Sequence, residues 1–322
     1  MMTQTIAAAG SHRCYTRHTR PDGTTYIRVE GTNRQENHAF IYLSRHFHDL
    51  GLPVPEIYEV AEDEMWYTQQ DLGDTLLFDA IRSGRENGIY NEEEIHLLTR
   101  TIRTLAHIQI KGAQGMDWSV CFPVSEFDRR TIMWDLNYFK YCFLKLSLPE
   151  FSEPLLEDDF ENMAEHLLMQ PGETFLYRDF QSRNVMVKDG NPYFIDYQGG
   201  RRGPIYYDLA SFLWQAKANF PNSLREELIS HYIDELREIN HSRAKKGQIV
   251  DCQCFNRETL SRFVLFRTLQ VLGAYGLRGL IEKKAHFIES IPFAIHNLRA
   301  LFEQHYFLQN DYPYIYQIAQ QL

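Results

Sequence analysis

The 322-residue sequence predicts an α+β fold in which a small, β-rich N-terminal lobe precedes a larger helical C-terminal lobe. Three observations predict it. Short strand-like segments surround one helix between residues 20 and 70, helical patterns dominate the rest of the chain, and strand-like sequence returns once, at 174–197. We place the lobes at 1–72 and 74–322, with a hinge near 69–73. Because ligand sites favour junctions of this kind, we expect a site between the lobes.

The N-terminal lobe is predicted from two strand-like segments and one amphipathic helix. Residues 24–29 alternate in polarity, are rich in β-forming side chains and follow a Pro-Asp-Gly turn. Residues 36–50 place their apolar side chains on one helical stripe. Residues 65–69 predict a second strand, which Asp71-Leu72-Gly73 ends.

The C-terminal lobe is predicted from a series of amphipathic segments. They cover residues 92–110, 128–146, 158–169 and 224–239, with two or three more helices between 259 and 301. The exception at 174–197 has the order strand, loop, strand, turn, strand, and its Asp189-Gly190 pair is a strong hairpin signal.

Composition excludes several classes of function. The chain has 33 Lys and Arg against 43 Asp and Glu, a formal net charge of −10, which argues against non-specific nucleic-acid binding. No apolar run approaches the roughly 20 residues that span a bilayer, and the first residues lack a secretory signal pattern. Five dispersed cysteines do not predict a disulfide framework, and the histidines form no zinc motif. We therefore expect a cytoplasmic protein with a small-molecule partner, and the sequence does not indicate its oligomeric state.

Three polar side chains gather in the strand-like exception. Asp179 lies on the loop between two strands, and a hairpin around residues 189–190 would bring Asn184 and Asp196 together beside it. Two carboxylates and an amide oxygen suit Mg²⁺, which binds few protein oxygens together with substrate phosphates. They also match kinases, in which one Asp accepts the hydroxyl proton while an Asn and a second Asp hold metal. Singly, each of the three residues is more typical of a turn.

Three segments carry a resemblance to a known family. Residues 178–186 resemble the catalytic loop of the aminoglycoside phosphotransferase and choline kinase-like family, small-molecule kinases with a protein-kinase-like fold. Residues 203–211 are similar to the stretch that follows the metal-binding Asp of that family. Residues 266–273 resemble the C-terminal lobe of the bacterial N-acetylmuramate/N-acetylglucosamine anomeric kinases, the subgroup that the chain as a whole most resembles.

The resemblance implies a role for each of the three polar residues. It makes Asp179 the catalytic base and makes Asn184 and Asp196 the metal ligands. It also implies ATP as the phosphoryl donor and Mg²⁺ as the metal.

Three further residues are expected to support the catalytic loop. Asp208 precedes a helical run, so we expect it to cap that helix and to connect it to the loop through Arg183 or Tyr177. Tyr177 stands where the family usually has His, and we expect its hydroxyl to make a hydrogen bond in the same supporting role.

The resemblance to the family is weaker where the nucleotide would bind. Gly10 and Ser11 are similar to the turn that covers the phosphates. A strand Lys that pairs with a helix Glu is expected next, and this sequence has Arg28 there, with Glu36 as its candidate partner. An arginine and a lysine are not interchangeable, because a guanidinium is a planar fork and an ammonium is a point charge.

Residues 67–73 resemble the hinge that contacts adenine through backbone groups. Gln70 and Leu72 are the candidate contacts in this segment.

The acceptor is the least constrained part of the sequence. The segment at 128–135 resembles one that carries an acidic residue near the acceptor, so Asp135 is the candidate sugar contact, with Arg267 and Arg278 as candidate partners of an acidic sugar. The sequence thus predicts an ATP- and Mg²⁺-dependent phosphotransferase that acts on a hydroxyl of an amino sugar, the anomeric one included. The alternatives are an aminoglycoside- or choline-type kinase, and a catalytically silent nucleotide-binding regulator.

Overall fold

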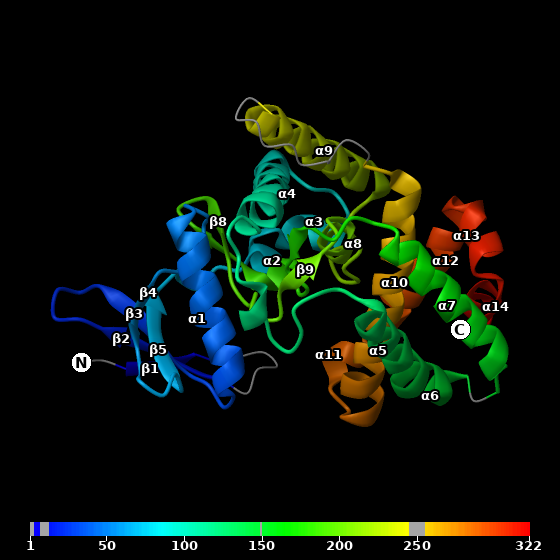
Figure 1. The fold of residues 1–322 in the computed structure, drawn as a ribbon, viewed down its shortest axis with the longest axis horizontal. Helices are drawn as coiled ribbons and strands as arrows, with labels where there is room; N and C mark the ends of the chain where they lie inside the picture. The colour runs from blue at the N-terminus through cyan, green and yellow to red at the C-terminus, as the bar shows by residue number, and fades with distance from the viewer. Residues whose placement is uncertain (1–2, 7–12, 149, 245–254) are drawn as a thin grey trace.

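The computed structural model describes residues 3–6, 13–148, 150–244 and 255–322. A small antiparallel sheet with helix α1 forms one end of the molecule, and most of the helices gather at the other end (Figure 1). We call β1–β5 with α1 the N-terminal lobe and the elements from α2 onward the C-terminal lobe. The fold class is the one that the sequence predicts, whereas the boundary near residues 69–73 stays a prediction.

The sheet of the N-terminal lobe has the strand order β1-β2-β3-β5-β4, and each neighbouring pair is antiparallel. Two of its strands, β3 and β5, match the predicted segments to within one residue. The strands of the sheet are β1 (Thr3–Ile6), β2 (Cys14–Thr19), β3 (Thr25–Glu30), β4 (Ile57–Val60) and β5 (Trp66–Gln70).

Helix α1 (Arg34–Asp49) packs between this sheet and the C-terminal lobe. Asn33 caps its first turn, because its side chain accepts hydrogen bonds from the backbone N–H groups of Gln35 and Glu36. From its buried face, Phe40 stacks on Tyr67 of β5 at 5.2 Å between ring centroids and on Tyr197 of the C-terminal lobe at 5.0 Å. The helix therefore connects the sheet to the chain segment just after Asp196.

The C-terminal lobe is helical, as the sequence predicts, but several of its helices begin or end elsewhere. The predicted helix at 128–146 is divided into α5, a π-helical segment and a short α6, and α7 begins five residues before the predicted start at 158. The helices are α2 (Leu77–Ala80), α3 (Arg82–Asn87), α4 (Glu92–Gly112), α5 (Arg129–Phe139), α6 (Lys145–Ser147), α7 (Glu153–Leu168), α8 (Tyr206–Leu213), α9 (Asn222–Ala244), α10 (Arg257–Tyr275), α11 (Ala285–Ile288), α12 (Ile291–Gln304), α13 (Tyr306–Asp311) and α14 (Pro313–Gln321).

Helix α10 is the central support of this lobe, and it packs closely on α5. A Cβ atom added at Gly273 would lie 2.8 Å from the backbone nitrogen of Phe139, so the two helices could not keep this spacing with a larger residue there. The contact fixes α5 and α10 relative to each other. None of the helices in the described ranges is both long enough and apolar enough to cross a membrane.

The strands predicted at 174–197 are present. They are β6 (Thr174–Leu176), β7 (Val185–Lys188) and β8 (Asn191–Phe194), and β7 and β8 form the predicted hairpin. Asp189 and Gly190 both have positive φ, at 51° and 70°, as a tight two-residue turn requires. Strand β6 pairs with β9 (Arg201–Gly203), a strand that the sequence analysis did not predict.

Candidate active site

The loop that follows β6 is held by one buried carboxylate. Both oxygens of Asp208 accept backbone hydrogen bonds, Oδ2 from the N–H of Tyr177 at 2.8 Å and Oδ1 from the N–H of Arg178 at 2.9 Å. Gln109 of α4 also donates to Oδ2, at 3.1 Å. Burial raises the pKa of Asp208 to about 6, although these hydrogen bonds act in the opposite direction. Asp208 therefore fixes the start of the loop that carries Asp179.

Two details differ from the expectation for Asp208. It does not cap α8, because the capping position is Ile205 and Asp208 lies inside the first turn of the helix. Nor does its connection to the loop run through Arg183, whose exposed guanidinium lies 3.7 Å from the ring centre of Phe78. The connection runs through Tyr177, the other of the two expected residues, whose backbone N–H donates to Asp208 together with that of Arg178.

Tyr177 supports the other side of the loop. Its ring is buried, and its hydroxyl donates a hydrogen bond to the carbonyl oxygen of Ile195, directly before Asp196. The N–H of Ile195 in turn donates to the carbonyl oxygen of Asn184, at 3.1 Å. These bonds hold the two strand ends that carry Asn184 and Asp196 in a fixed relation.

The structure brings Asp179, Asn184 and Asp196 together beside the ends of β7 and β8, and we call this group of three residues the catalytic corner. The amide nitrogen Nδ2 of Asn184 donates to the carbonyl oxygen of Asp179 at 2.8 Å and to Oδ2 of Asp196 at 3.2 Å. Gln198 donates to Oδ1 of Asp196 at 2.8 Å. The Asn184 side chain is buried, whereas the side chain of Asp179 is 51% exposed and is thus open to a substrate. The accessible carboxylate of Asp179 thus lies next to the buried amide of Asn184 and the partly buried carboxylate of Asp196.

This corner fits a hard divalent cation. Burial and the neighbouring charge of Asp179 raise the pKa of Asp196. A cation between the two carboxylates would therefore reduce the repulsion between their charges. The two acceptors of Asn184 both bind its Nδ2, so these two hydrogen bonds leave its Oδ1 unused. Within the described ranges no three His, Cys, Asp or Glu side chains cluster as a metal site. The remaining ligands would have to be phosphate or water oxygens.

Two arginines lie near Asp179. Arg267 of α10 lies with its Nη2 atom 4.0 Å from Oδ1 of Asp179, and its Nε donates to Ser211 at 3.0 Å. Arg178 makes two parallel hydrogen bonds to Asp135 of α5, at 2.7 and 2.8 Å. Asp135 is only 6% exposed, and both of its oxygens are occupied by Arg178. Its contact with a sugar therefore stays a prediction.

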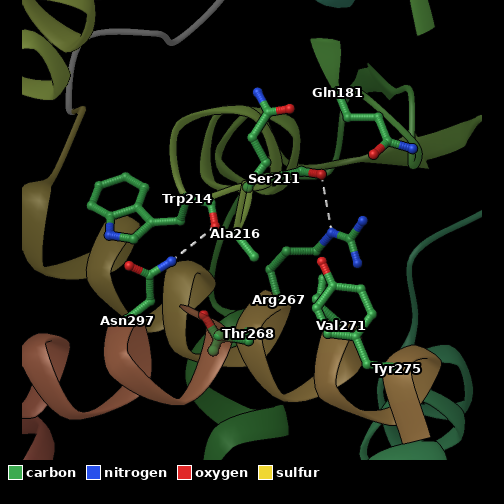
Figure 2. A pocket seen from close by; sticks show the side chains of 11 residues that line it. Gln181, Ser211, Trp214, Ala216, Arg267, Thr268, Val271, Tyr275 and Asn297 are labelled. Carbon is green, nitrogen blue, oxygen red and sulfur yellow. Dashed lines mark hydrogen bonds between the residues drawn. The ribbon is translucent and has the colours of Figure 1, made fainter. Parts of the chain in front are cut away.

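A pocket opens beside Arg267, between the catalytic loop, the end of α8 and helices α10 and α12 (Figure 2). Its cavity volume is about 40 Å³, and the pocket is partly open to solvent. In the figure, Arg267 and the hydroxyl of Tyr275 lie at one end and Trp214 lies at the other. The lining residues, all of them described, include no Asp or Glu; they are Gln181, Ser211, Trp214, Gln215, Ala216, Arg267, Thr268, Val271, Tyr275, Ala294 and Asn297.

The expected ion pair between Arg28 and Glu36 is wrong. Arg28 donates to Glu30 at 3.0 Å, and its guanidinium lies 3.9 Å from the ring centre of Trp66. Glu36 instead pairs with Arg13, whose Nη2 lies 3.1 Å from Glu36 Oε1. Side chains alternate between the faces of a strand, and the residue at position 28 belongs to the face opposite α1.

The other nucleotide contacts stay predictions. Gly10 and Ser11 lie outside the described residues. In the proposed hinge, the N–H of Gln70 donates to the carbonyl oxygen of Glu56 at 2.8 Å, and Leu72 is buried. The adjacent Asp71 is held by two hydrogen bonds from Arg17 of β2, at 2.6 and 3.0 Å. Arg17, which the sequence analysis did not single out, thus connects strand β2 of the sheet to the hinge segment.

Three residues with a place in the site were missed from sequence. Arg178 directly precedes Asp179, Arg13 lies two residues after Ser11, and Gln109 lies in a long amphipathic helix. The alternation Arg13, Tyr15, Arg17 could have indicated that Arg13 shares a face with its strand neighbours. No pattern around Gln109 would have indicated its contact with Asp208.

Comparison with known proteins agrees with this geometry. The sequence pattern of the phosphotransferase enzyme family matches residues 4–241. The chain is 27% identical to an N-acetylmuramate/N-acetylglucosamine kinase of Neisseria meningitidis over 237 residues, 72% of this chain and 66% of that protein. A protein of the same name from Pseudomonas putida is 21% identical over 70% of this chain and 64% of that protein. The chain thus spans slightly less than two thirds of the length of these relatives.

Solved structures share the fold at low sequence identity. The choline kinase LicA from Streptococcus pneumoniae superposes with a TM-score of 0.61 at 13% identity, over 93% of this chain and 94% of that one. A thermostable mutant of aminoglycoside phosphotransferase APH(4)-Ia superposes with a TM-score of 0.55 at 13% identity, over 94% of each chain. These likenesses confirm the predicted protein-kinase-like fold, and the sequence match covers well over half of the chain. The chain belongs to the phosphotransferase enzyme family.

Proposed function

We propose that this protein transfers the γ-phosphoryl group of ATP, with Mg²⁺, to a hydroxyl group of an N-acetylated amino sugar, the anomeric hydroxyl included. The family supports phosphoryl transfer, and the names of the two curated relatives support the amino sugar. The observation that carries the choice of acceptor is the pocket beside Arg267, which has no carboxylate among its lining residues and whose Arg267 lies 4.0 Å from Asp179.

In this proposal Asp179 accepts the proton of the acceptor hydroxyl. Its carboxylate is accessible, and the hydrogen bond from Asn184 to its carbonyl oxygen holds its backbone in place. Asn184 and Asp196 would hold Mg²⁺, which when bound neutralises charge on the transferring phosphates. Asp208 keeps the loop in position without touching the reactants. The chain thus contributes orientation and proton removal, the two tasks that remain to the protein in phosphoryl transfer.

The pocket argues against a cationic acceptor. Choline and aminoglycosides are positively charged, and such ligands are bound by carboxylates or by aromatic rings free of competing cations. Here the guanidinium of Arg267 lies in the pocket and would repel them. The remaining polar groups are amides and hydroxyls, which can donate to and accept from the hydroxyl and acetamido groups of a sugar. An acidic substituent, as in N-acetylmuramate, would in addition pair with Arg267.

A phosphoryl-transfer screen with Mg²⁺-ATP tests the proposal. The acceptors are N-acetylglucosamine, N-acetylmuramate, glucosamine, choline and kanamycin, and ³¹P NMR locates the phosphate on the product. We expect transfer to the two N-acetylated sugars and the product signal of an anomeric phosphate. Transfer only to cationic acceptors would contradict the choice of acceptor. ATP binding without transfer to any acceptor, unchanged in Asp179→Ala, would favour the silent regulator.

A matched pair of arginine variants on α10 tests the pocket. Arg267→Met should raise the KM for N-acetylmuramate by about tenfold, the equivalent of about 1.4 kcal/mol. Arg257→Met, on the same helix but in an exposed ion pair with Glu226, should leave it unchanged. If both variants had the same KM for N-acetylmuramate, the acceptor would bind outside this pocket.

A further inference from the structure

The ion pair between Arg13 and Glu36 lies where β2 meets helix α1. Arg13 directly precedes β2 and is 7% exposed, although its guanidinium is charged at every physiological pH. Its Nη2 atom lies 3.1 Å from Oε1 of Glu36, in the first turn of α1. The Glu36 side chain is 35% exposed, so the pair borders solvent instead of being sealed in a core.

Strand register places Arg13 on the face of the sheet that α1 covers. Tyr15 of β2 lies opposite Val29 of β3, which lies opposite Tyr67 of β5, and Tyr67 packs on α1. Position 13 is two residues before Tyr15, so it belongs to the same face by the two-residue period of a strand. Arg28 belongs to the opposite face. Of these two arginines, Arg13 is the one on the side of the C-terminal lobe.

A short chain of contacts leads from Arg13 to the catalytic corner. Its guanidinium lies 5.6 Å from the ring centre of Phe40, a cation–π contact. Phe40 stacks on Tyr197 at 5.0 Å, and Tyr197 directly follows Asp196. Arg13 and Asp196 are close enough for their charges to interact. A buried cation thus lies within electrostatic range of the carboxylate that faces the proposed phosphates.

We propose that Arg13, positioned by Glu36, contacts the phosphates of the nucleotide and takes the part that a lysine in the middle of β3 has in other kinases. The inference rests on the proposed function only in requiring a nucleoside triphosphate as the donor. A guanidinium presents five N–H donors in a planar fork, so Arg13 can keep its bond to Glu36 when it donates to a phosphate. Position 28 could not supply this cation, because its side chain points to the other face of the sheet.

Nucleotide affinity measured without any acceptor tests the inference. Dissociation constants are measured by calorimetry for Mg²⁺-ATP, Mg²⁺-ADP and adenosine. Arg13→Met should weaken ATP and ADP by about tenfold or more, since a hydrogen bond to a charged group is worth about 1.5–3 kcal/mol. It should leave adenosine, which has no phosphate, within about twofold. Arg13→Lys should retain part of the ATP affinity, because it keeps the charge but not the fork.

Two further variants separate this role from a structural one. Arg34→Met removes an exposed ion pair with Glu64 from the start of the same helix and should change none of the three affinities. Arg28→Met should likewise leave the preference for ATP over adenosine unchanged. Equal weakening of ATP and adenosine in Arg13→Met, or none, would show that the pair is only structural and would overturn the inference. Should Arg13→Met not fold, the ratio of ATP to adenosine affinity in Arg13→Lys decides in the same way.

The outcome also separates this inference from the proposed function. If the wild-type protein transfers phosphate to a sugar and Arg13→Met does so with unchanged ATP affinity, only the role of Arg13 fails. If the wild-type protein binds no ATP at all, the proposed function and the inference fail together.

Discussion

The two sides of the candidate site are built differently. On the side of the C-terminal lobe, side chains hold backbone: Asp208 accepts from two N–H groups of the catalytic loop, and Asn184 donates to the carbonyl oxygen of Asp179. On the side of the N-terminal lobe, the contacts are ion pairs between side chains, such as Arg13 with Glu36 and Arg17 with Asp71. Bonds to backbone fix the geometry of a loop, whereas ion pairs at a lobe junction can reform with a new partner.

This difference indicates a division of labour. The C-terminal side keeps the reacting groups in a fixed arrangement, as a proton acceptor requires. On the N-terminal side, Arg13 is the cation that we propose to contact a phosphate while it keeps its bond to Glu36. The following predictions test the contrast, beginning with the largest expected effect.

Asp179→Asn should remove the chemistry while leaving the site intact. The substitution keeps the size of the side chain and the backbone bond from Asn184 but removes the proton acceptor. We expect kcat to fall by about 10²–10⁴-fold, the usual contribution of a general base, while the affinity for Mg²⁺-ATP changes by less than about twofold. Steady-state kinetics and calorimetry measure the two quantities. Retained turnover would contradict the role of Asp179.

The Arg178–Asp135 pair should contribute more to stability than to acceptor binding. Asp135→Ala leaves a mostly buried guanidinium without its carboxylate, which should cost about 3–5 kcal/mol in the free energy of unfolding. Urea denaturation measures this cost, and Asp135→Ala combined with Arg178→Ala should cost less than the sum of the two.

An exposed ion pair on the same helix provides the matched control. Glu161→Ala breaks the pair of Arg129, at the start of α5, with Glu161 and should cost less than about 1 kcal/mol. If Asp135→Ala instead raised only the KM for the sugar and left stability unchanged, Asp135 would be the substrate contact that the sequence resemblance implies.

Asp208→Ala should loosen the catalytic loop. It leaves the buried N–H groups of Tyr177 and Arg178 without their acceptor, at a cost of about 2–3 kcal/mol in the free energy of unfolding. We also expect faster amide hydrogen exchange at residues 177–179 with little change in the N-terminal sheet. Uniformly faster exchange in both lobes would show that the two sides are not held separately.

A second buried carboxylate, outside the candidate site, shows how such a group affects stability where it has no part in catalysis. Asp159 of α7 accepts from the backbone N–H groups of Tyr314 and Ile315, and burial raises its pKa to about 6. A carboxyl group whose pKa is higher in the folded state binds its proton more tightly there. Its contribution to stability is therefore greatest at low pH and declines as the pH rises from about 4 to about 6.

The Asn variant isolates this contribution. The stability of the wild-type protein minus that of Asp159→Asn should fall by on the order of 1 kcal/mol between pH 5 and pH 7. Urea denaturation at the two pH values measures the difference. A difference that stays constant or rises with pH would contradict the raised pKa.

The sequence predicted the C-terminal side of the site better than the N-terminal side for a physical reason. Asn184 directly precedes β7 and Asp196 follows β8 of one short hairpin, and Asp179 lies on the loop just before it, so local turn chemistry is enough to bring them together. The Asp189-Gly190 turn and the apolar flanks determine the register of that hairpin from sequence alone.

The N-terminal side depends on which face of a strand each residue occupies. A shift of one residue along a strand moves a side chain to the other face of the sheet. The charge of Arg28 alone does not show which face its side chain occupies. Arg13 was missed for the same reason. The capping role given to Asp208 was wrong because α8 begins three residues earlier than its sequence indicates, so that Asp208 reaches the loop from within the helix.

The pairing of Asn184 and Asp196 as metal ligands for a nucleotide is tested most directly by electron paramagnetic resonance with Mn²⁺ as the probe. ATP binds Mn²⁺ in solution by itself, so the measurement follows the change in the spectrum of bound Mn²⁺ when protein is added to preformed Mn²⁺-ATP. The wild-type protein should produce this change and should bind little Mn²⁺ without ATP, because the protein supplies few ligands and the phosphates supply the others. In Asp196→Asn this ATP-dependent binding should be lost, while the exposed-pair control Glu161→Ala should keep it. Equal Mn²⁺ binding by Asp196→Asn and the wild-type protein in the presence of ATP would contradict the account.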